Sequence, residues 1–384
     1  MKLCYLNILW TSDPGVLNKL GHQARALRNA MGRDDTADCL IVVRQEVADR
    51  VKKSPSLILF PISAPGSSSV QEALLPFLVW SKLKNRLSEY SAVVTRWTIP
   101  SSTFLNVVRR QPVFTEHHSK ELEEIALHRG LKPFARRILE KKYGPRILRA
   151  THGIIGVTDE IRRYELNRAG CKQPSLVLPN GISLEGIPFK PPSVFDGKSL
   201  QLAFVSSQFA PWQGLDRLLE GLRVWRSRSP RLTLHLIGRL TPAQETAIQR
   251  MGLAEMVRIH GVLYGSDLDG VMSSCHLAIG SLALHRKMLR EACALKVREY
   301  TARGLPFVIS HDDPDLPARL PWVLKIPADD SPVDINSIVD FAAKVSGLTS
   351  LATEMRSYAE KKLSWVVKMK RLAKFVQDNI EHCM

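Results

Sequence analysis

Short apolar runs rich in β-branched residues alternate along the chain with longer segments of helical periodicity. This alternation limits the fold more than any other feature, because it is typical of parallel α/β sheets. The strands expected in the first half are residues 2–9, 38–43, 92–95, 113–115, 153–157 and 175–178. Those expected in the second half are residues 200–205, 232–237, 257–259, 277–279 and 306–309. Each half therefore predicts one doubly wound sheet.

A segment that contains prolines and glycines, residues 188–197, separates the two series as a linker would. We expect an N-terminal Rossmann-like domain over residues 1–190 and a C-terminal Rossmann-like domain over residues 198–350. Residues 351–384 have apolar side chains at helical spacing and predict C-terminal helices that cross back to the N-terminal domain. Ligands of such sheets bind beyond the carboxyl ends of the strands, so we expect a cleft between two facing domains.

Net charge and cysteine content indicate which partners and which cellular compartment the protein can have. The net charge of +17 attracts polyanions but does not choose among nucleic acid, anionic lipid and phosphorylated substrates. The six scattered cysteines form no C-x-x-C pair, which favours a reduced, cytoplasmic compartment and predicts no metal site. No apolar run reaches the ~20 residues of a spanning helix, and residues 1–10 predict a first strand rather than a signal peptide.

The sharpest local signal is the segment EACALKVREYTARGLP at residues 291–306, which contains Glu291 and Glu299. If a helix begins near Leu295, Glu291 lies in the preceding loop and Glu299 lies one turn into the helix. The backbone N–H groups at such a helix start suit a phosphate. Nearby carboxylates can accept hydrogen bonds from sugar hydroxyls, as acidic residues do in dinucleotide-binding folds.

This segment resembles the E-x7-E motif of family 4 of the retaining glycosyltransferases, in the L-K-V-x-E-Y-x-A-x-G-L-P form common in that family. The resemblance implies the GT-B fold, an α/β architecture of two Rossmann-like domains that face each other across a cleft. It implies that Glu291 contacts the transferred sugar and that Glu299 holds the nucleotide ribose. It also implies that backbone amides around Leu295, Lys296 and Val297 meet the donor phosphates.

Segments of the first half resemble the acceptor domain of these enzymes. DPGVLNK resembles the loop after the first strand, where Gly15 lets the backbone approach the substrate. YSAVVTR and PVFTEHHS resemble successive strand ends, and the second carries an active-site histidine in the family. His118 is the first alignment and His117 the second, with Arg96 and Glu116 as acceptor or supporting contacts. A purely structural histidine is the alternative reading.

FVSSQFAPWQGLDRLL and LIGR resemble the first two strand ends of the donor domain. Many relatives have a Gly-Arg pair and a lysine there, and these cations neutralise the donor diphosphate. Here Ser206, Ser207 and Gln213 take their places, so other donors must contribute. The candidate diphosphate contacts are Ser207, Gln213, Arg239, Arg286, Lys287 and Lys296. Packing of this loop by Trp212 is an alternative role for it.

A basic stretch runs from Arg129 to Arg149, with eight Lys or Arg residues against Glu140 alone and an apolar side that includes Phe134 and Ile138. An interfacial surface on anionic lipid fits this composition. A solvated helix face fits it equally well.

These observations predict a retaining, metal-independent glycosyltransferase with no cofactor beyond its nucleoside-diphosphate sugar. The expected acceptor is the hydroxyl of a glycan or lipid-linked glycan, in bacterial surface polysaccharide or glycolipid synthesis. We expect a cytoplasmic protein, peripheral at the inner face of the membrane. The alternatives are a GT-B sugar-nucleotide epimerase, a phosphorylase-like enzyme and a basic nucleic-acid-binding protein. No helix-turn-helix, RNP-type or zinc-finger signature supports specific nucleic-acid binding.

Overall fold

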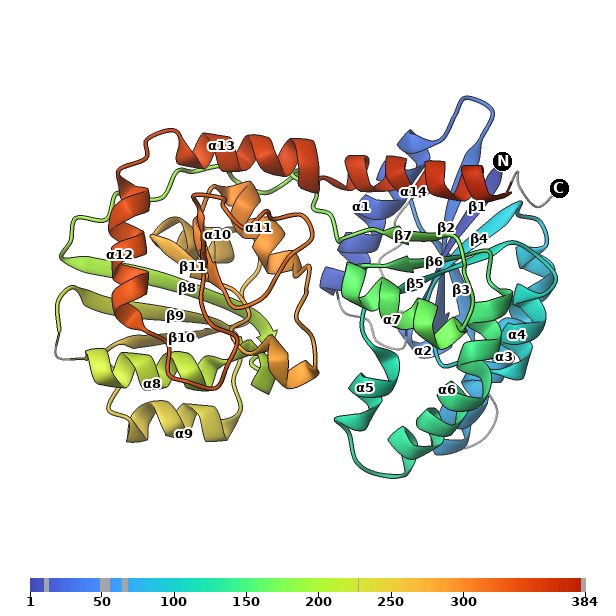
Figure 1. The fold of residues 1–384 in the computed structure, drawn as a ribbon, viewed down its shortest axis with the longest axis horizontal. Helices are drawn as coiled ribbons and strands as arrows, with labels where there is room; N and C mark the ends of the chain where they lie inside the picture. Colours follow the sequence, from blue (N-terminus) through green and yellow to red (C-terminus); the bar gives the residue numbers. More distant parts are fainter. Residues whose placement is uncertain (10–13, 49–55, 64–67, 227, 381–384) are drawn as a thin grey trace. The chain divides into compact units, whose positions relative to one another are not determined.

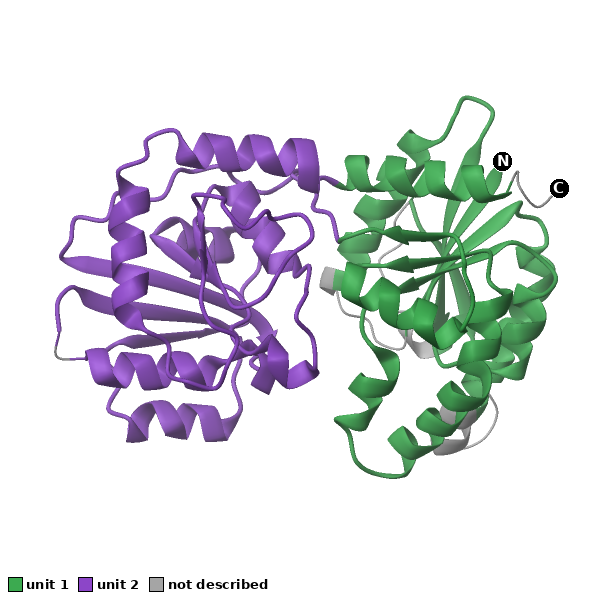
Figure 2. Ribbon diagram, in the orientation of Figure 1, with its two compact units in different colours: residues 1–179, 365–384 green, residues 180–364 purple. Residues whose placement is uncertain are grey.

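The computed structural model describes the chain apart from residues 10–13, 49–55, 64–67, 227 and 381–384 (Figure 1). The chain divides into two compact units, which are coloured separately in Figure 2. Unit 1 contains residues 1–179 and 365–384, and unit 2 contains residues 180–364. The boundary therefore lies about ten residues before the linker expected from the sequence, and residues 351–364 belong to unit 2.

Unit 1 is built on a seven-stranded sheet of order β3-β2-β1-β4-β5-β6-β7, in which every neighbouring pair is parallel. Its strands are β1 (Lys2–Leu9), β2 (Thr36–Arg44), β3 (Ile58–Ile62), β4 (Ala92–Arg96), β5 (Val113–His117), β6 (Gly153–Gly156) and β7 (Ser175–Val177). Its helices are α1 (Pro14–Ala30), α2 (Gln45–Ala48), α3 (Ser68–Leu87), α4 (Ser102–Val108), α5 (Glu121–Ala126), α6 (Leu131–Ala150), α7 (Asp159–Ala169) and α14 (Trp365–Ile380). The strand order reverses between β1 and β4, which is where ligands of open α/β sheets bind.

Unit 2 has a six-stranded parallel sheet of order β10-β9-β8-β11-β12-β13. Its strands are β8 (Ser199–Gln208), β9 (Arg231–Arg239), β10 (Val257–Gly261), β11 (Leu277–Ile279), β12 (Phe307–Ile309) and β13 (Val323–Lys325). Its helices are α8 (Leu215–Trp225), α9 (Pro242–Arg250), α10 (Gly265–Ser273), α11 (Leu295–Arg303), α12 (Ile335–Ser346) and α13 (Leu351–Tyr358). Its strand order reverses between β8 and β11. The predicted fold class, two doubly wound parallel sheets, is confirmed.

Alternate residues of β1 enter two separate cores on the two faces of the sheet in unit 1. Cys4 and Leu6 join the core under α3, α4 and α6. Leu3 and Tyr5 join the core under α1 and α14. This division follows from the two-residue period of a strand, and it explains why β1 reads as a continuous apolar run.

The last helix, α14, belongs to the core of unit 1 although the whole of unit 2 precedes it in the chain. Its residues Met369, Leu372 and Val376 are almost fully buried and share a cluster with Leu20 and Leu27 of α1. Replacing such a leucine with alanine costs ~2 to 5 kcal/mol. The helix therefore stabilises unit 1 directly.

Two edge strands escaped the sequence analysis. β3 contains Pro61, which lacks the N–H of a ladder bond and is tolerated because β3 pairs only with β2. β13 has three residues and pairs only with β12. The proline within β3 and the three-residue length of β13 weaken the sequence signal of both strands.

Candidate functional site

The segment that carries both motif glutamates forms a loop followed by α11, which begins at Leu295 as predicted. The N-cap residue of this helix is Ala294, whose side chain makes no capping hydrogen bond. The helix ends at Gly304, whose φ of 75° lies in the left-handed region, and an added Cβ would sit 2.8 Å from the Cβ of Ala352. The start of α11 is therefore a helix N-terminus of the kind that binds phosphate.

The loop that carries Glu291 is held from two sides. Its backbone pairs with that of Asp312 as an isolated parallel bridge. Arg298, one turn into α11 and wholly buried, donates both terminal nitrogens to Asp313 and its Nε to the carbonyl oxygen of Asn180 at 3.1 Å. Removing one partner of such a buried pair costs ~3 to 5 kcal/mol. Arg298 therefore fixes the loop, and the sequence analysis gave it no role.

Lys296 and Gln213, two of the predicted donor-binding residues, meet in space. The Nζ of Lys296 donates to Gln213 Oε1 at 2.6 Å and lies 4.8 Å from the centre of the Phe204 ring. Ser281, which follows β11 and was not predicted, donates to the same Gln213 oxygen at 3.0 Å. Burial lowers the pKa of Lys296 to about 7. Among the described residues, no carboxylate forms an ion pair with Lys296.

Ser206 and Ser207 lie near the carboxyl end of β8, beside the end of β9. Ser206 is buried and donates its hydroxyl to the carbonyl oxygen of Gln208 at 2.6 Å, whereas Ser207 is exposed. Gly238 has a φ of 136°, and a Cβ there would lie 1.5 Å from the Ser206 carbonyl oxygen, so only glycine fits. Arg239 then ends β9 with an exposed side chain. Ser207 and Arg239 thus lie at the carboxyl ends of neighbouring strands.

The two cations after β11 already have partners. Arg286 donates to both carboxylate oxygens of Asp216, at 2.9 and 2.8 Å, and its Nε donates to Asp330 at 2.8 Å. Lys287 lies 4.7 Å from the centre of the Trp212 ring. Because two carboxylates compensate Arg286, it is a weaker candidate for binding phosphate than Lys296.

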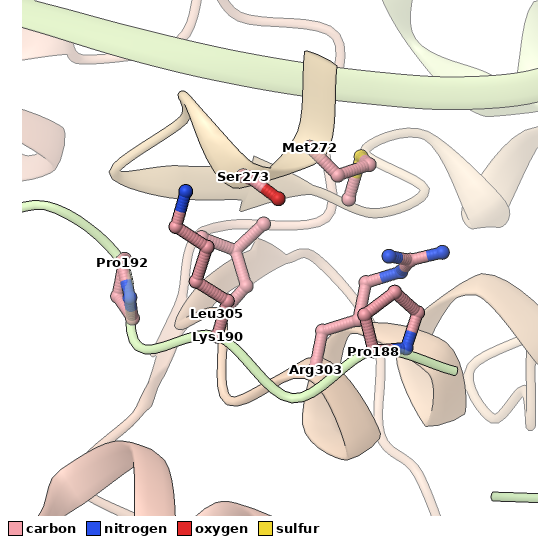
Figure 3. Close-up of a pocket in the computed structure, with 7 residues that line it drawn as sticks. All are labelled: Pro188, Lys190, Pro192, Met272, Ser273, Arg303 and Leu305. Atoms are coloured by element: carbon pink, nitrogen blue, oxygen red, sulfur yellow. The ribbon is translucent and has the colours of Figure 1, made fainter. Parts of the chain in front are cut away.

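Glu299 faces Arg303, one turn further along α11. It accepts two hydrogen bonds from this guanidinium, at 2.9 and 2.7 Å, and its side chain is 29% exposed. Arg303 also pairs with Asp269 of α10 at 2.7 Å. Figure 3 shows Arg303 beside Pro188 at a pocket whose volume of about 10 Å³ admits no more than a water molecule. Arg303 thus orients Glu299 without closing it off from solvent.

In unit 1, Glu116 and His118 form a hydrogen-bonded network at the end of β5. The Nε2 of His118 lies 2.9 Å from Glu116 Oε1, and Tyr5 donates its hydroxyl to Glu116 Oε2 at 2.6 Å. Burial opposes ionisation of Glu116, but His118 and Tyr5 outweigh it and lower the pKa of this carboxyl to about 2. Burial, assisted by the charge of Arg96, lowers the pKa of His118 to about 4.

This pair fixes the tautomer of His118. An ionised Glu116 only accepts hydrogen bonds, so the neutral imidazole of His118 carries its proton on Nε2. Its Nδ1 is then the atom with a lone pair. The His118 side chain is 16% exposed.

His117 lies on the opposite face of β5 and is fully buried. Its Nε2 lies 3.1 Å from the Thr115 hydroxyl and its Nδ1 lies 3.5 Å from Glu165 Oε1, while its ring packs 4.7 Å from that of Trp97. Burial lowers its pKa well below the usual value. This environment is that of a structural histidine.

Two further predicted residues of unit 1 lie at the same edge of the sheet. Arg96 ends β4 with an exposed side chain and is in register with Glu116. Gly15 is the second residue of α1, and residues 10–13 of its loop lie outside the described part of the chain. Within the described part, no group of three or more His, Cys, Asp or Glu side chains is arranged to hold a metal ion.

No family model and no curated protein sequence matches the chain. Solved structures do. A sucrose-phosphate synthase from Thermosynechococcus elongatus superposes with a TM-score of 0.69 at 15% identity, over 99% of this chain and 100% of that one. A glycosyltransferase from Rickettsia africae gives 0.67 at 13% identity, over 99% of both chains. Anabaena HepE in complex with UDP and glucose gives 0.65 at 16% identity, over 98% of this chain and 100% of that one.

These similarities establish the fold. The chain has the GT-B fold, and the structures it resembles include glycosyltransferases. Identities of 16% or less carry no residue roles and no substrate from one protein to another.

Proposed function

We propose that this protein is a retaining, metal-independent glycosyltransferase of the family 4 type that uses a nucleoside-diphosphate sugar. The observation that carries the proposal is the meeting of Lys296 with Gln213 beside the start of α11, at the switch point between β8 and β11. A cation that pairs with no carboxylate in the described part of the chain and a helix N-terminus both favour an anion at this point. A diphosphate is the anion that a sugar donor supplies.

The donor diphosphate binds unit 2 through four kinds of contact in this proposal. Lys296 supplies the positive charge that the family's usual lysine supplies from the position of Gln213. The amides at the start of α11, Ser207 and Arg239 supply the remaining donors. Glu299, oriented by Arg303, accepts hydrogen bonds from the ribose.

Transfer needs one bond to form and one to break. The acceptor hydroxyl oxygen bonds to the anomeric carbon on the face that the leaving diphosphate departs from, and the bond from that carbon to the phosphate oxygen breaks. The acceptor proton passes to the diphosphate oxygen, so no enzymic nucleophile is required. Glu291 stabilises the positive charge that develops on the sugar, and its anchored loop keeps the carboxylate in place.

His118 is the group of unit 1 that we propose to hydrogen-bond a sugar hydroxyl. Glu116 holds the imidazole in the Nε2–H tautomer, so that Nδ1 accepts a hydrogen bond from a sugar hydroxyl. Arg96 lies in register with Glu116 and is proposed to contact the acceptor. The proposed acceptor is a glycan or lipid-linked glycan of a bacterial surface polymer.

A screen of nucleoside-diphosphate sugars for release of the diphosphate, with and without glycan acceptors, tests the proposal. We expect acceptor-dependent release with one donor, unchanged by a chelator of divalent cations, and a product with the anomeric configuration of the donor by NMR. Inversion would contradict retention, and loss of activity in chelator would contradict metal independence. Conversion of the donor sugar to its epimer without an acceptor would replace a transferase by an epimerase.

A further inference from the structure

Helices α5 and α6 form a hairpin that extends away from the sheet of unit 1 (Figure 1). Its turn contains Gly130, whose φ of 116° is a backbone conformation that favours glycine. Four large apolar side chains near this turn are exposed to solvent: Leu127 at 45%, Leu131 at 87%, Phe134 at 63% and Ile138 at 49%. The last three follow each other at intervals of three and four residues, so they share one face of α6. A monomeric soluble protein rarely leaves such a stripe uncovered.

Basic side chains flank this apolar stripe, and others occupy the same face of α6 beyond its end at Ile138. Lys141 and Lys142 follow Ile138 by three and four residues, and Arg129, Lys132 and Arg137 flank the stripe near the turn; all five are exposed. Further along α6, the apolar residues turn inward to the core.

The carboxylates Glu121, Glu123 and Glu124 of the hairpin lie on α5, and α6 has a single one. Glu140, the only acidic residue of the helix, is buried and accepts a hydrogen bond from Arg168 at 2.6 Å. Arg136 pairs with Glu121 at the base of α5 at 2.9 Å, which ties the two helices together. The tip of the hairpin is therefore apolar, and the surface next to it is basic.

We propose that the α5–α6 hairpin docks on an anionic lipid bilayer, with Leu131, Phe134 and Ile138 among the acyl chains and the neighbouring cations on the headgroup phosphates. Apolar residues with a basic border match the two layers of such an interface. A second copy of the chain would bring the same cations against them, so charge complementarity selects the bilayer. None of the described helices is long and apolar enough to cross a membrane. The proposal rests on the hairpin alone and not on glycosyl transfer.

Vesicle co-sedimentation of the full chain without any sugar nucleotide tests this proposal. We expect binding to vesicles that contain phosphatidylglycerol, little binding to pure phosphatidylcholine, and weaker binding as salt rises. Leu131→Ser with Phe134→Ser should weaken binding by roughly 10-fold or more, because burial of two large apolar side chains is lost. Lys141→Glu with Lys142→Glu should weaken it by a similar factor.

Two matched controls come from unit 2. Val224→Ser replaces an exposed apolar side chain, and Arg250→Glu with Arg258→Glu makes the same change in net charge as the lysine pair. Both controls should bind like the parent. Equal binding to anionic and neutral vesicles would overturn the proposal, as would hairpin variants that sediment like the parent. Concentration-dependent dimers that the serine variant abolishes, without vesicle binding, would assign the stripe to a second copy instead.

Discussion

The switch points of the two sheets differ in whether a buried charged side chain has a partner that stabilises its charge. In unit 1, the buried carboxylate of Glu116 has two partners, Tyr5 and the neutral His118, so its charge is already stabilised within the unit. In unit 2, the ammonium of Lys296 donates to the amide oxygen of Gln213 and lies over the Phe204 ring, and it forms no ion pair with a carboxylate of the described residues. The two switch points therefore differ, because the buried charge of unit 1 is compensated within the unit, whereas the buried ammonium of unit 2 has no carboxylate beside it among the described residues. That difference is the reason why we propose that the donor diphosphate binds unit 2.

The largest effect is expected in unit 2, where Glu291→Gln should reduce turnover by about 10²-fold or more, because it removes a charge beside the developing cationic sugar. Nucleoside diphosphate binding should hardly change. Steady-state kinetics and calorimetry measure the two effects, with Glu255→Gln, an exposed site in the same unit, as the control. A Glu291→Gln variant that turns over like the parent would remove Glu291 from the chemistry.

Lys296→Met should weaken nucleoside diphosphate binding by roughly 10- to 100-fold, since a hydrogen bond to a charged group is worth ~1.5 to 3 kcal/mol. Methionine keeps an apolar stem against Phe204 and loses the charge together with the hydrogen bond to Gln213. Lys344→Met, at an exposed site on α12, is the matched control. The comparison between the units breaks if His118→Asn in unit 1 weakens binding of the diphosphate as much as Lys296→Met does.

Glu299→Gln should weaken nucleotide binding by roughly 10-fold, because the amide still meets a ribose hydroxyl but loses the charge-assisted part of the bond. Turnover at saturating donor should fall less than in Glu291→Gln. Affinities for the nucleoside monophosphate and for inorganic diphosphate, which has no ribose, separate the ribose contact from the diphosphate contacts. If the variant loses affinity equally for inorganic diphosphate, Glu299 does not act through the ribose.

The smallest effect, on the order of 1 kcal/mol, concerns stability between about pH 4.5 and 10.5. Burial raises the pKa of Glu121 to about 7 and of Glu165 to about 8, so these carboxyls hold protons in folded unit 1 that the unfolded chain releases above about 4.5. Their contribution to stability therefore falls as the pH rises from about 4.5 to about 8. Burial lowers the pKa of Lys296 from 10.5 in the unfolded chain to about 7 in folded unit 2. Between these pH values the unfolded chain binds more protons, so the stability of unit 2 rises with pH from about 7 to 10.5.

Urea unfolding followed by hydrogen exchange of peptides from each unit measures this opposition. Lys296→Met should remove the rise in unit 2 and leave the fall in unit 1. Parallel pH dependence of the two units would contradict the pKa shifts on which the comparison rests.

The sequence predicted the strands with long apolar runs and the start of α11, because the spacing of apolar residues and the E-x7-E motif depend only on residues that are close together in the chain. The meeting of Lys296 with Gln213 lies beyond such patterns, since it depends on how β8 and β11 are ordered in the sheet. The buried pair of Arg298 and Asp313 is similar, because a charged residue in a helix pattern suggests solvent. The α5–α6 stripe was visible as composition, but its exposure depends on how far the hairpin extends from the core.

The most direct test of the central claim is the number of protons taken up when a nucleoside diphosphate binds. At about pH 8, a Lys296 with a pKa of about 7 is mostly neutral, and a bound diphosphate raises that pKa because it favours the charged form. Calorimetry in buffers of different ionisation enthalpy should therefore show uptake of close to one proton, and Lys296→Met should abolish it. Binding without proton uptake, or uptake that persists in Lys296→Met, would contradict the assignment of the diphosphate to unit 2.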